Sequence, residues 1–491
     1  MNETPSRSAG QEDLAGPIKA HDNLGRPTTP HHDLARPMTP LGWRLTALGI
    51  LGGGLLVGDR AAASGLGRRA VALTAGVAGA WVASIMLASR RPPIPPASVG
   101  DGTPVPTDGL TFTVLVAARD EAGVLPNLVA DVARQTYRDA AGEPCFELLV
   151  VDDRSTDGTA AVVAEAAAQE GIAEVTRLVR RDGQNLLDGK GAALTAAPPE
   201  ACKGDIVVVL DADARIGPSF LATLAAYFRA GASAVTARRR VLDPGGSNLA
   251  GAQADEQTLD GELQRGRWAL GGCSEFRGNG IVIRRDLLAE VGGWRAEALT
   301  EDLDLSSRVA AATGIRVVWA VDAELWEEPV PDWGGLFRQR LRWGEGGIRR
   351  AFELGPRVLA SDRLPLPAKV DFGLYVGQLT VPPLLLGLIG GSLRRGRTGV
   401  GLAFIGIYGL VGGTLAFDAL RWETAPGGRP VSRPERVWRA ARVALFNGLW
   451  LAAIPGAMWR LATRQGPVGY DKMAHGSAQA AEPSRPATTG G

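Results

Sequence analysis

The chain carries long apolar stretches near both ends and a different, shorter apolar pattern in its middle. The long stretches cover 41–58, 70–88, 370–393, 400–417 and 443–459. Each is near the ~20 residues that an α-helix needs to cross the hydrocarbon of a bilayer. From 110 to 350, short β-branched runs alternate with helical segments, a pattern typical of parallel α/β sheets. We therefore predict two transmembrane helices, then one α/β domain, then about three more transmembrane helices.

The predicted domain boundaries follow these changes of pattern. Residues 1–40 repeat a Pro-rich decamer and carry too few apolar side chains for a core, so we expect a disordered tail. The other units are two transmembrane helices (41–91), a Pro-rich linker (92–109), the α/β domain (110–350), an interfacial segment (351–369), about three transmembrane helices (370–460) and a C-terminal tail (461–491).

The orientation of the chain in a membrane is predicted from its basic loops. Arg90 and Arg91, directly after the second apolar stretch, favour a cytoplasmic α/β domain. A later basic link with Arg394, Arg395 and Arg397 favours the opposite orientation. The exact topology stays open at this level. We expect a multi-pass integral membrane protein whose α/β domain lies in the cytoplasm.

Within the α/β domain, acidic residues follow the strands that the pattern predicts. Strands are expected at 111–118, 146–151, 174–179 and 206–210, with helices at 124–135 and 159–169 between them. The first strand precedes Arg119-Asp120-Glu121, the second precedes Asp152-Asp153, and the fourth precedes Asp211-Ala212-Asp213. Parallel strands share a carboxyl edge, where open α/β sheets bind their ligands. These polar groups are therefore expected to form one site.

Composition narrows the chemistry of that site. The net charge is only +1, so no overall field recruits nucleic acid. The three cysteines, Cys145, Cys202 and Cys273, are far apart and odd in number, which indicates a reducing compartment and neither a disulfide framework nor a zinc site. The four histidines lie at positions 21, 31, 32 and 475, outside the α/β domain. Acid–base chemistry in the domain therefore depends on carboxylates.

Two acidic motifs are candidates for a nucleotide site. Asp211 and Asp213, one residue apart after a buried strand, can supply oxygen ligands to Mg²⁺ or Mn²⁺ beside a diphosphate, although such a pair also occurs in solvated turns. Asp152 and Asp153 are placed to accept a uracil N–H or a ribose hydroxyl. The alternative for 155–157 is that these residues only cap the next helix.

Three further motifs lie in the second half of the domain. Lys190 stands in a Gly-flanked loop that departs from a P-loop, and it is either a point charge for the nucleotide or an idle surface lysine. The glycines of the segment 275–280 allow a sugar or an acceptor to approach the backbone closely, or the segment is a plain turn. Trp294 offers an aromatic platform before the acidic segment 300–305. Helix capping by Thr300 also accounts for that acidic segment without catalysis. Gln339-Arg340-Leu341-Arg342-Trp343 lies in an amphipathic stretch, where Arg342 can clamp a diphosphate, or the stretch is only an interfacial anchor.

Taken in order, Asp152-Asp153, Asp211-Ala212-Asp213, Thr300-Glu301-Asp302 and Gln339-x-x-Arg342-Trp343 resemble the motifs of the inverting family 2 glycosyltransferases with the GT-A fold. The likeness covers about 110–347. A narrower likeness, carried by 271–280, 300–305, 339–347 and Lys472-Met473-Ala474-His475-Gly476, is to the cyanobacterial β-monoglucosyldiacylglycerol synthases. The chain departs from that pattern at Gly344 and Glu301. The resemblance implies an α/β GT-A domain with a mostly parallel sheet, flanked by transmembrane helices.

The resemblance also implies the activity and the role of each residue. The family moves glucose from UDP-glucose to diacylglycerol with Mg²⁺, and Mn²⁺ is an alternative metal. It implies that Asp302 is the general base and that Asp211 and Asp213 hold the metal. The implied donor-binding residues are Asp152, Asp153, Lys190, Asp211, Gln339, Arg342 and Trp343. The implied acceptor-side residues are Arg277, Asn279, Gly280, Trp294 and Glu301.

Two alternative functions remain at this level. A processive polysaccharide synthase of the cellulose or hyaluronan synthase type shares the donor chemistry, but the Gly-rich apolar stretches offer no polar lining for a polymer channel. An inactive membrane scaffold is the alternative of another class. The expected partners are UDP-glucose and diacylglycerol, with no nucleic acid and no obligate protein partner evident.

Overall fold

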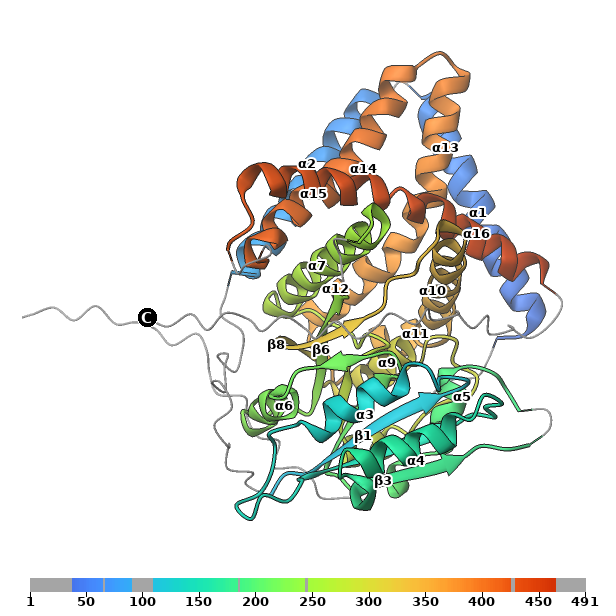
Figure 1. Ribbon diagram of the computed structural model, residues 1–491. Coiled ribbons are helices and arrows are strands. Elements are labelled where there is room, and N and C mark those ends of the chain that lie inside the picture. The colour runs from blue at the N-terminus through green and yellow to red at the C-terminus, as the bar shows by residue number, and fades with distance from the viewer. Residues whose placement is uncertain are drawn as a thin grey trace, which may run out of the picture.

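The computed structural model describes residues 38–64, 67–90, 109–183, 186–242, 246–424 and 429–464. The repeats of the N-terminal tail, nearly all of the Pro-rich linker and the motif 472–476 lie outside these residues. Two parts make up the described chain (Figure 1). One is an α/β domain built on a single sheet, and the other is a set of long helices that stand on one side of it.

The α/β domain contains an eight-stranded sheet in the order β3-β2-β1-β4-β7-β6-β8-β5. Its strands are β1 (Phe112–Ala118), β2 (Phe146–Asp152), β3 (Thr176–Arg180), β4 (Ile206–Asp211), β5 (Arg215–Ile216), β6 (Ala234–Val241), β7 (Ile281–Arg284) and β8 (Val318–Glu327). The first four are parallel neighbours, whereas β7 runs antiparallel to both β4 and β6. The predicted α/β GT-A fold with a mostly parallel sheet is confirmed.

The register of the parallel strands brings their carboxyl ends level. Ala118 at the end of β1 pairs with Asp152 of β2, and Ala117 pairs with Asp211 of β4. The four strands predicted from the sequence therefore exist, within two residues at each end, and three of them share the expected edge. Their continuous apolar sequence is explained by burial on both faces, since Val114 and Val116 belong to one hydrophobic core and Leu115 to another.

Helices cover both faces of the sheet. One core contains α3 (Leu125–Ala133), α4 (Thr159–Gln169) and α6 (Phe220–Arg229). The opposite core contains α5 (Lys190–Leu194), α8 (Arg285–Glu290) and α9 (Glu301–Thr313). The helices α5 and α9 begin at Lys190 and Glu301. The side chains of these two candidate residues lie close together, so both helices begin at the same edge of the sheet.

Four helical segments are long and apolar enough to cross a membrane: Leu41–Ala63, Leu366–Arg394, Thr398–Trp422 and Arg433–Thr463. They contain α1 (Pro40–Ala63), α12 (Leu366–Gly377), η3 (Gln378–Thr380), α13 (Val381–Arg394), α14 (Thr398–Ala419), η4 (Leu420–Trp422), α15 (Arg433–Phe446) and α16 (Leu449–Thr463). In the second predicted N-terminal span, α2 (Gly67–Ala88), the described apolar part is the shorter Ala72–Ala88. The membrane-helix prediction is therefore supported for one N-terminal and three C-terminal segments.

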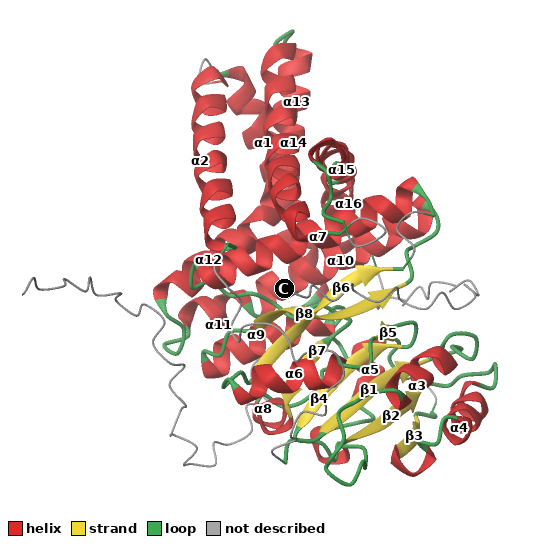
Figure 2. Cartoon of the chain, turned by 60° about the vertical axis from the view of Figure 1, so that its left-hand side comes forward, coloured by secondary structure: helices red, strands yellow, loops and turns green. Residues whose placement is uncertain are grey.

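The long helices do not all run in one direction. Figures 1 and 2 show α1, α2, α13 and α14 standing upright, with the α13–α14 turn at the end farthest from the sheet. At that end, Asp59 of α1 forms ion pairs with Arg394 and Arg395. The basic link that favoured the opposite orientation is thus partly neutralised within the protein. By contrast, α15 and α16 run across the upright helices in Figure 1.

The polar helix α7 (Asn248–Ala269) joins the two parts. It packs against β6 and β8 on one side and against α2, α14 and α15 on the other. Asp255 of α7 is buried and accepts hydrogen bonds from Arg439 and Arg442 of α15. Because an unpaired charge at this depth costs several kcal/mol, these pairs hold α15 to the α/β domain.

Candidate active site

A cavity of about 1560 Å³ lies between the carboxyl edge of the sheet and the long helices. Its polar wall comes from the ends of β1, β4 and β8, from the starts of α5 and α9, and from α7 and α10 (Trp333–Glu353). The structure brings these sequence-predicted residues together in that wall: Asp153, Lys190, Asp211, Asp213, Arg277, Asn279, Glu301, Asp302, Gln339, Arg342 and Trp343. These side chains therefore line one cavity, as expected for residues that follow parallel strands.

One end of the cavity is a chain of alternating charges. Asp153, which is buried, forms ion pairs with Arg154 at 2.9 Å and with Arg181 at 2.7 Å. Arg154 also contacts Asp188 at 2.8 Å, and a second arginine, Arg119, contacts the same carboxylate at 2.7 Å. The hydrogen bond from Arg119 is the largest influence that holds the pKa of Asp188 below its usual range. The Asp153 carboxylate is thus held in position by two arginines.

The predicted helix cap at 155–157 is a bridge between two loops. The hydroxyl of Ser155 accepts a hydrogen bond from the backbone N–H of Asp120, and the Asp157 carboxylate accepts from the N–H of Ala122 and of Thr159. The Asp120 carboxylate accepts in return from the N–H of Thr156. These hydrogen bonds connect the loop after β1 to the loop after β2, directly beside Asp153.

Lys190 is the centre of the acidic cluster and not an idle surface residue. Its ammonium group donates to the carboxylate of Asp211 and to the backbone carbonyl of Gly278. The same nitrogen lies 3.8 Å from Glu301 Oε1. The side chain is only 13% exposed, so these charges interact in a partly desolvated space. One cation therefore links β4, α9 and the segment before β7.

Asp211 and Asp213 supply the donor set expected for a divalent cation. Burial, followed by the charges of Asp211 and Glu327, raises the pKa of Asp213 well above its usual range. Carboxylates in such a buried and acidic environment are the groups that a hard cation neutralises. Among the residues that the structure describes, no group of three His, Cys, Asp or Glu side chains is arranged to hold a metal by itself. The residues fit a metal that takes its remaining ligands from phosphate oxygens and water.

The start of α9 places two carboxylates at the centre of the cavity. A Cβ atom at Gly278 would lie 3.7 Å from Glu301 Oε1 and 3.8 Å from Asp302 Oδ2, so both side chains converge on that backbone. Burial is the largest influence that raises the pKa of Glu301, to about 7, with Lys190 opposing it and Asp302 adding to it. Burial also raises the pKa of Asp302. A carboxylate whose pKa approaches neutrality is suited to accept a proton.

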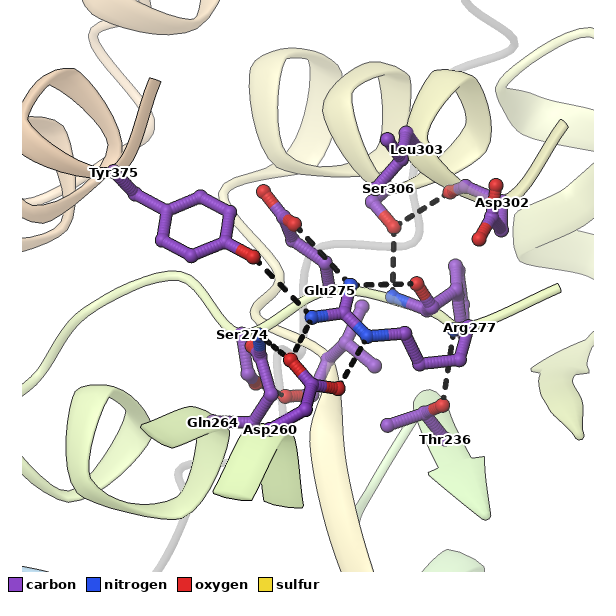
Figure 3. A network of polar contacts seen from close by, with 12 residues as sticks. Thr236, Asp260, Gln264, Ser274, Glu275, Arg277, Asp302, Leu303, Ser306 and Tyr375 are labelled. Atoms are coloured by element: carbon purple, nitrogen blue, oxygen red, sulfur yellow. Dashed lines mark hydrogen bonds and ion pairs between the residues drawn. The ribbon is translucent and has the colours of Figure 1, made fainter. Parts of the chain in front are cut away.

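Arg277 is held in the cavity wall by several polar side chains (Figure 3). Its guanidinium donates to both carboxylate oxygens of Asp260 at 2.6 and 2.7 Å and to the hydroxyl of Tyr375 at 3.3 Å. Glu275 adds a contact at 3.4 Å. The figure shows Asp302 on the far side of Arg277 from Tyr375. Arg277 therefore connects α7 and α12 to the loop that carries Gly278, and it orders the site while lining it.

The segment 339–343 lies on α10, and its residues have different neighbours. Arg340 donates to Gln339 and to Glu256 of α7. The ring of Trp343 lies 4.1 Å from the guanidinium of Arg340 and 5.8 Å from that of Arg239. Gln339, Arg342 and Trp343 all line the cavity. The predicted interfacial stretch is therefore part of the site wall.

Three residues of the predicted site lie elsewhere. Trp294 is buried in the hydrophobic core under α8 and α9 and offers no platform to an acceptor. Asp152 is buried at the end of β2, where its carboxylate accepts from the N–H of Ser155. Gly280 has φ +85°, and a Cβ there would lie 2.7 Å from Leu325 and 2.8 Å from Ala237, so this glycine serves the crossing of strands. These are corrections to the predicted site.

Arg239 and Glu327 are two of the cavity residues that the sequence did not reveal. Arg239 of β6 lines the cavity and lies 3.7 Å from Glu327, which lines it as well. Its neighbours Arg238 and Arg240 point to the opposite face of the strand, where both contact Glu423. Side chains alternate along a strand, so a strand assignment at 238–240 would have separated the middle arginine from the other two.

The mixed sheet and the acidic cluster at its carboxyl edge define a GT-A glycosyltransferase. A family model described as "Glycosyltransferase like family 2" matches residues 109–346. The beta-monoglucosyldiacylglycerol synthase of Synechocystis sp. is 30% identical over 392 residues, which are 78% of this chain and 78% of that protein. The chain belongs to glycosyltransferase family 2.

Two further comparisons agree with this assignment. The beta-monoglucosyldiacylglycerol synthase of Nostoc sp. is 32% identical over 252 residues, about half of each protein. Among solved structures, a mannosyltransferase from Pyrobaculum calidifontis in complex with GDP-Man and Mn²⁺ matches 87% of this chain and 99% of its own, with a TM-score of 0.50 and 19% identity. That likeness shows the fold alone.

Proposed function

We propose that this glycosyltransferase moves glucose from UDP-glucose to the 3-hydroxyl of 1,2-diacylglycerol and makes β-monoglucosyldiacylglycerol. One observation carries the proposal: the acidic site and a space between apolar helices are parts of the same cavity. The relatives in Synechocystis sp. and Nostoc sp. are named for a monoglucosyldiacylglycerol product, which supports glucose as the sugar and diacylglycerol as the acceptor. A glycolipid precursor of galactolipids would be the product.

In this proposal the residues of the cavity divide the chemistry among them. Asp153 holds the uridine, and Lys190, Gln339, Arg342 and Trp343 hold the diphosphate side of the donor. Asp211 and Asp213 would hold Mg²⁺ or Mn²⁺, which neutralises charge on the diphosphate. The oxygen of the lipid hydroxyl attacks the anomeric carbon, and Asp302 accepts the proton that this hydroxyl loses. One in-line displacement on the face opposite UDP converts the α-linkage to a β-linkage.

The proposed location follows from the same arrangement. The long helices would cross the bilayer, and the α/β domain would face the cytoplasm, where nucleotide sugars are found. A processive polysaccharide synthase remains the second candidate because it shares the donor chemistry. The acidic cluster with raised carboxyl pKa values argues against an inactive scaffold.

The test uses membranes that contain the full chain. These are incubated with diacylglycerol and with each labelled UDP-sugar, with and without EDTA. We expect chloroform-soluble glucosyl lipid from UDP-glucose, and no product with EDTA. Transfer of unrelated sugars at equal rates, or no lipid product at all, contradicts the proposal. An insoluble or size-dispersed product favours the polysaccharide synthase.

A further inference from the structure

The cavity has an apolar part that the transfer chemistry does not require. Beyond the polar wall, its lining continues between the long helices and includes Leu73, Val77, Trp81, Leu385, Leu388 and Phe404, here called the apolar chamber. The whole cavity, about 1560 Å³, exceeds the ~300–1,000 Å³ usual for small-molecule sites. A nucleotide sugar therefore leaves space that an apolar ligand can fill.

The apolar chamber has a closed side and an open side. On the closed side, Leu388 and Phe404 are buried where α1, α13 and α14 pack together. On the open side, Leu73 and Val77 of α2 line the cavity although they are 70% and 63% exposed. Leu374 of α12 also lines it at 65% exposure. Figure 2 shows α2 and α12 on the same side of the molecule. Because these lining side chains are exposed, the cavity is open to that side.

The chamber does not continue to the far end of the upright helices. In the described chain, its lining on α13 ends at Leu388 and its lining on α14 begins at Phe404. Beyond Leu388, a Cβ at Gly391 would lie 2.6 Å from the Asp59 carboxylate and 3.0 Å from Ala62 Cβ, which shows how closely α13 packs on α1 there. Arg397 closes the turn by donating to the carbonyl of Ala62 at 2.7 Å. A growing polysaccharide requires a polar path with an exit, whereas this chamber is apolar and closed at its end.

Polar side chains stand where the apolar chamber meets the carboxylates. Tyr375 of α12 lines this junction, and its hydroxyl accepts a hydrogen bond from Arg277. The guanidinium of Arg267 lies over the Tyr375 ring, 3.6 Å from the ring centroid. Gln378, one turn further along the helix, also lines the cavity. A glycerolipid has the same order of groups, with a hydroxyl, then ester carbonyls, then acyl chains. The cavity presents matching groups in that order: the carboxylate of Asp302, the hydroxyl of Tyr375 and the apolar side chain of Val77.

From this match we infer that the opening beside Leu73, Val77 and Leu374 is a lateral entrance through which an uncharged two-chain glycerolipid passes from the bilayer into the apolar chamber. Its chains then lie along α2, α13 and α14, and its hydroxyl faces Asp302. This inference rests on the proposed lipid acceptor. It adds a specificity: the chamber recognises the acyl chains, separately from the recognition of sugar and hydroxyl.

The experiment compares Val77→Trp with Leu87→Trp in the full chain reconstituted in vesicles. Both residues lie on α2 and are exposed, at 63% and 70%, but only Val77 lines the cavity. Glucosyl transfer is measured with dioleoylglycerol and with the short-chain dihexanoylglycerol. We expect Val77→Trp to lower kcat/KM about tenfold or more for the long-chain lipid and about twofold or less for the short one. Leu87→Trp should change neither.

A second measurement does not depend on transfer. A two-chain glycerolipid with a photoactivatable diazirine in one acyl chain is crosslinked to the wild-type protein, and the labelled peptides are mapped. Labelling of α2 near Val77 and of α14 near Phe404 supports the entrance, whereas labelling spread over the outer face near Leu87 overturns it. Equal effects of the two tryptophan variants overturn it as well, even if glucolipid is made. If no lipid is glycosylated but the chamber is labelled, the proposed function fails and the lipid entrance stands.

Discussion

Lys190 Nζ lies 3.8 Å from Glu301 Oε1, although the two residues begin separate helices on one face of the sheet. The same ammonium group also donates to Asp211. Burial raises the pKa of both Glu301 and Asp302, Lys190 opposes this rise in both, and the charge of Asp302 adds to the rise for Glu301. Lys190 thus favours the ionised form of both carboxylates, and at Asp302 it does so together with Arg277 and Arg239.

This arrangement predicts opposite pH shifts for two variants. Activity should fall as the pH is lowered, because the pair Glu301 and Asp302 takes up a proton. In Glu301→Gln the neighbouring negative charge is lost, so the pKa of Asp302 falls and the acid limb of kcat moves to lower pH. In Lys190→Met the positive charge is lost, so the limb moves to higher pH. The check is kcat measured from pH 5.5 to 9 for the three proteins. Shifts in the same direction, or none, would show that Lys190 and Glu301 act only structurally.

Asp302→Asn should abolish proton acceptance while leaving the shape of the site nearly unchanged. We expect kcat to fall by ~10²–10⁴, the usual contribution of a general base. Affinity for UDP should stay within about twofold, because Asp153 and the residues of α10 are not altered. The two quantities are measured by glucolipid formation and by UDP titration of the purified protein. Loss of UDP binding in parallel with kcat would assign Asp302 to donor binding instead.

Asp213→Asn should make the metal-free protein more stable and the enzyme less active. The folded pKa of Asp213 lies above its usual value, so ionisation costs stability progressively as the pH rises from that usual value through the folded one. Asparagine does not carry this cost. Above neutral pH and in EDTA, we expect a higher Tm for the variant. Added Mg²⁺ or Mn²⁺ should raise the Tm of the wild type and not that of the variant.

Asp188→Asn is the control for this prediction. Asp188 lines the same cavity, but its pKa lies below its usual range because of Arg119 and Arg154. Its removal should lower Tm slightly, since the side chain is 42% exposed, and leave the response to metal unchanged. A Tm gain in both variants would remove the argument for a cation at Asp213.

The sequence could predict the parts of the site that depend on parallel strands. Asp153, Asp211 and Asp213 follow strands of continuous apolar residues, and the parallel rule alone brings them to one edge. Lys190 stands at the start of a helix on the same face, which explains why its ammonium group reaches Asp211 at that edge. For these residues the local pattern and the fold agree.

Other parts of the site depend on tertiary contacts that no local pattern reveals. Trp294 follows two glycines in the sequence, and such a turn can precede a core residue as readily as a binding platform. The polar helix α7 has no apolar stripe, yet Asp255 and Glu262 are buried because arginines of the long helices meet them. Packing in the hydrophobic core decides the case of Trp294, and ion pairs between distant segments decide the case of α7.

The packing of α10 on α9 gives the last prediction. A Cβ at Gly346 would lie 2.3 Å from Thr300 Cγ2 and 2.9 Å from Thr300 Cβ. Thr300 stands directly before Glu301 and Asp302, and a β-branched side chain has little freedom to move aside. In Gly346→Ala the start of α9 must therefore shift. Small displacements of a catalytic group can cost ~10²-fold in rate, so we expect a loss of about 10- to 100-fold in kcat with a modest fall in Tm.

Gly347→Ala is the matched control, because a Cβ there meets only Leu379 at 3.9 Å, an ordinary contact. It should keep its activity within about twofold, since helix propensity slightly favours alanine. The double variant Gly346→Ala/Thr300→Ala removes the two closest atoms and should recover part of kcat, a coupling that independent sites do not show. Activity is measured as glucolipid formation, and Tm by thermal unfolding in detergent. Equal losses in Gly346→Ala and Gly347→Ala, or no recovery in the double variant, would mean that α10 does not position Asp302 through Thr300.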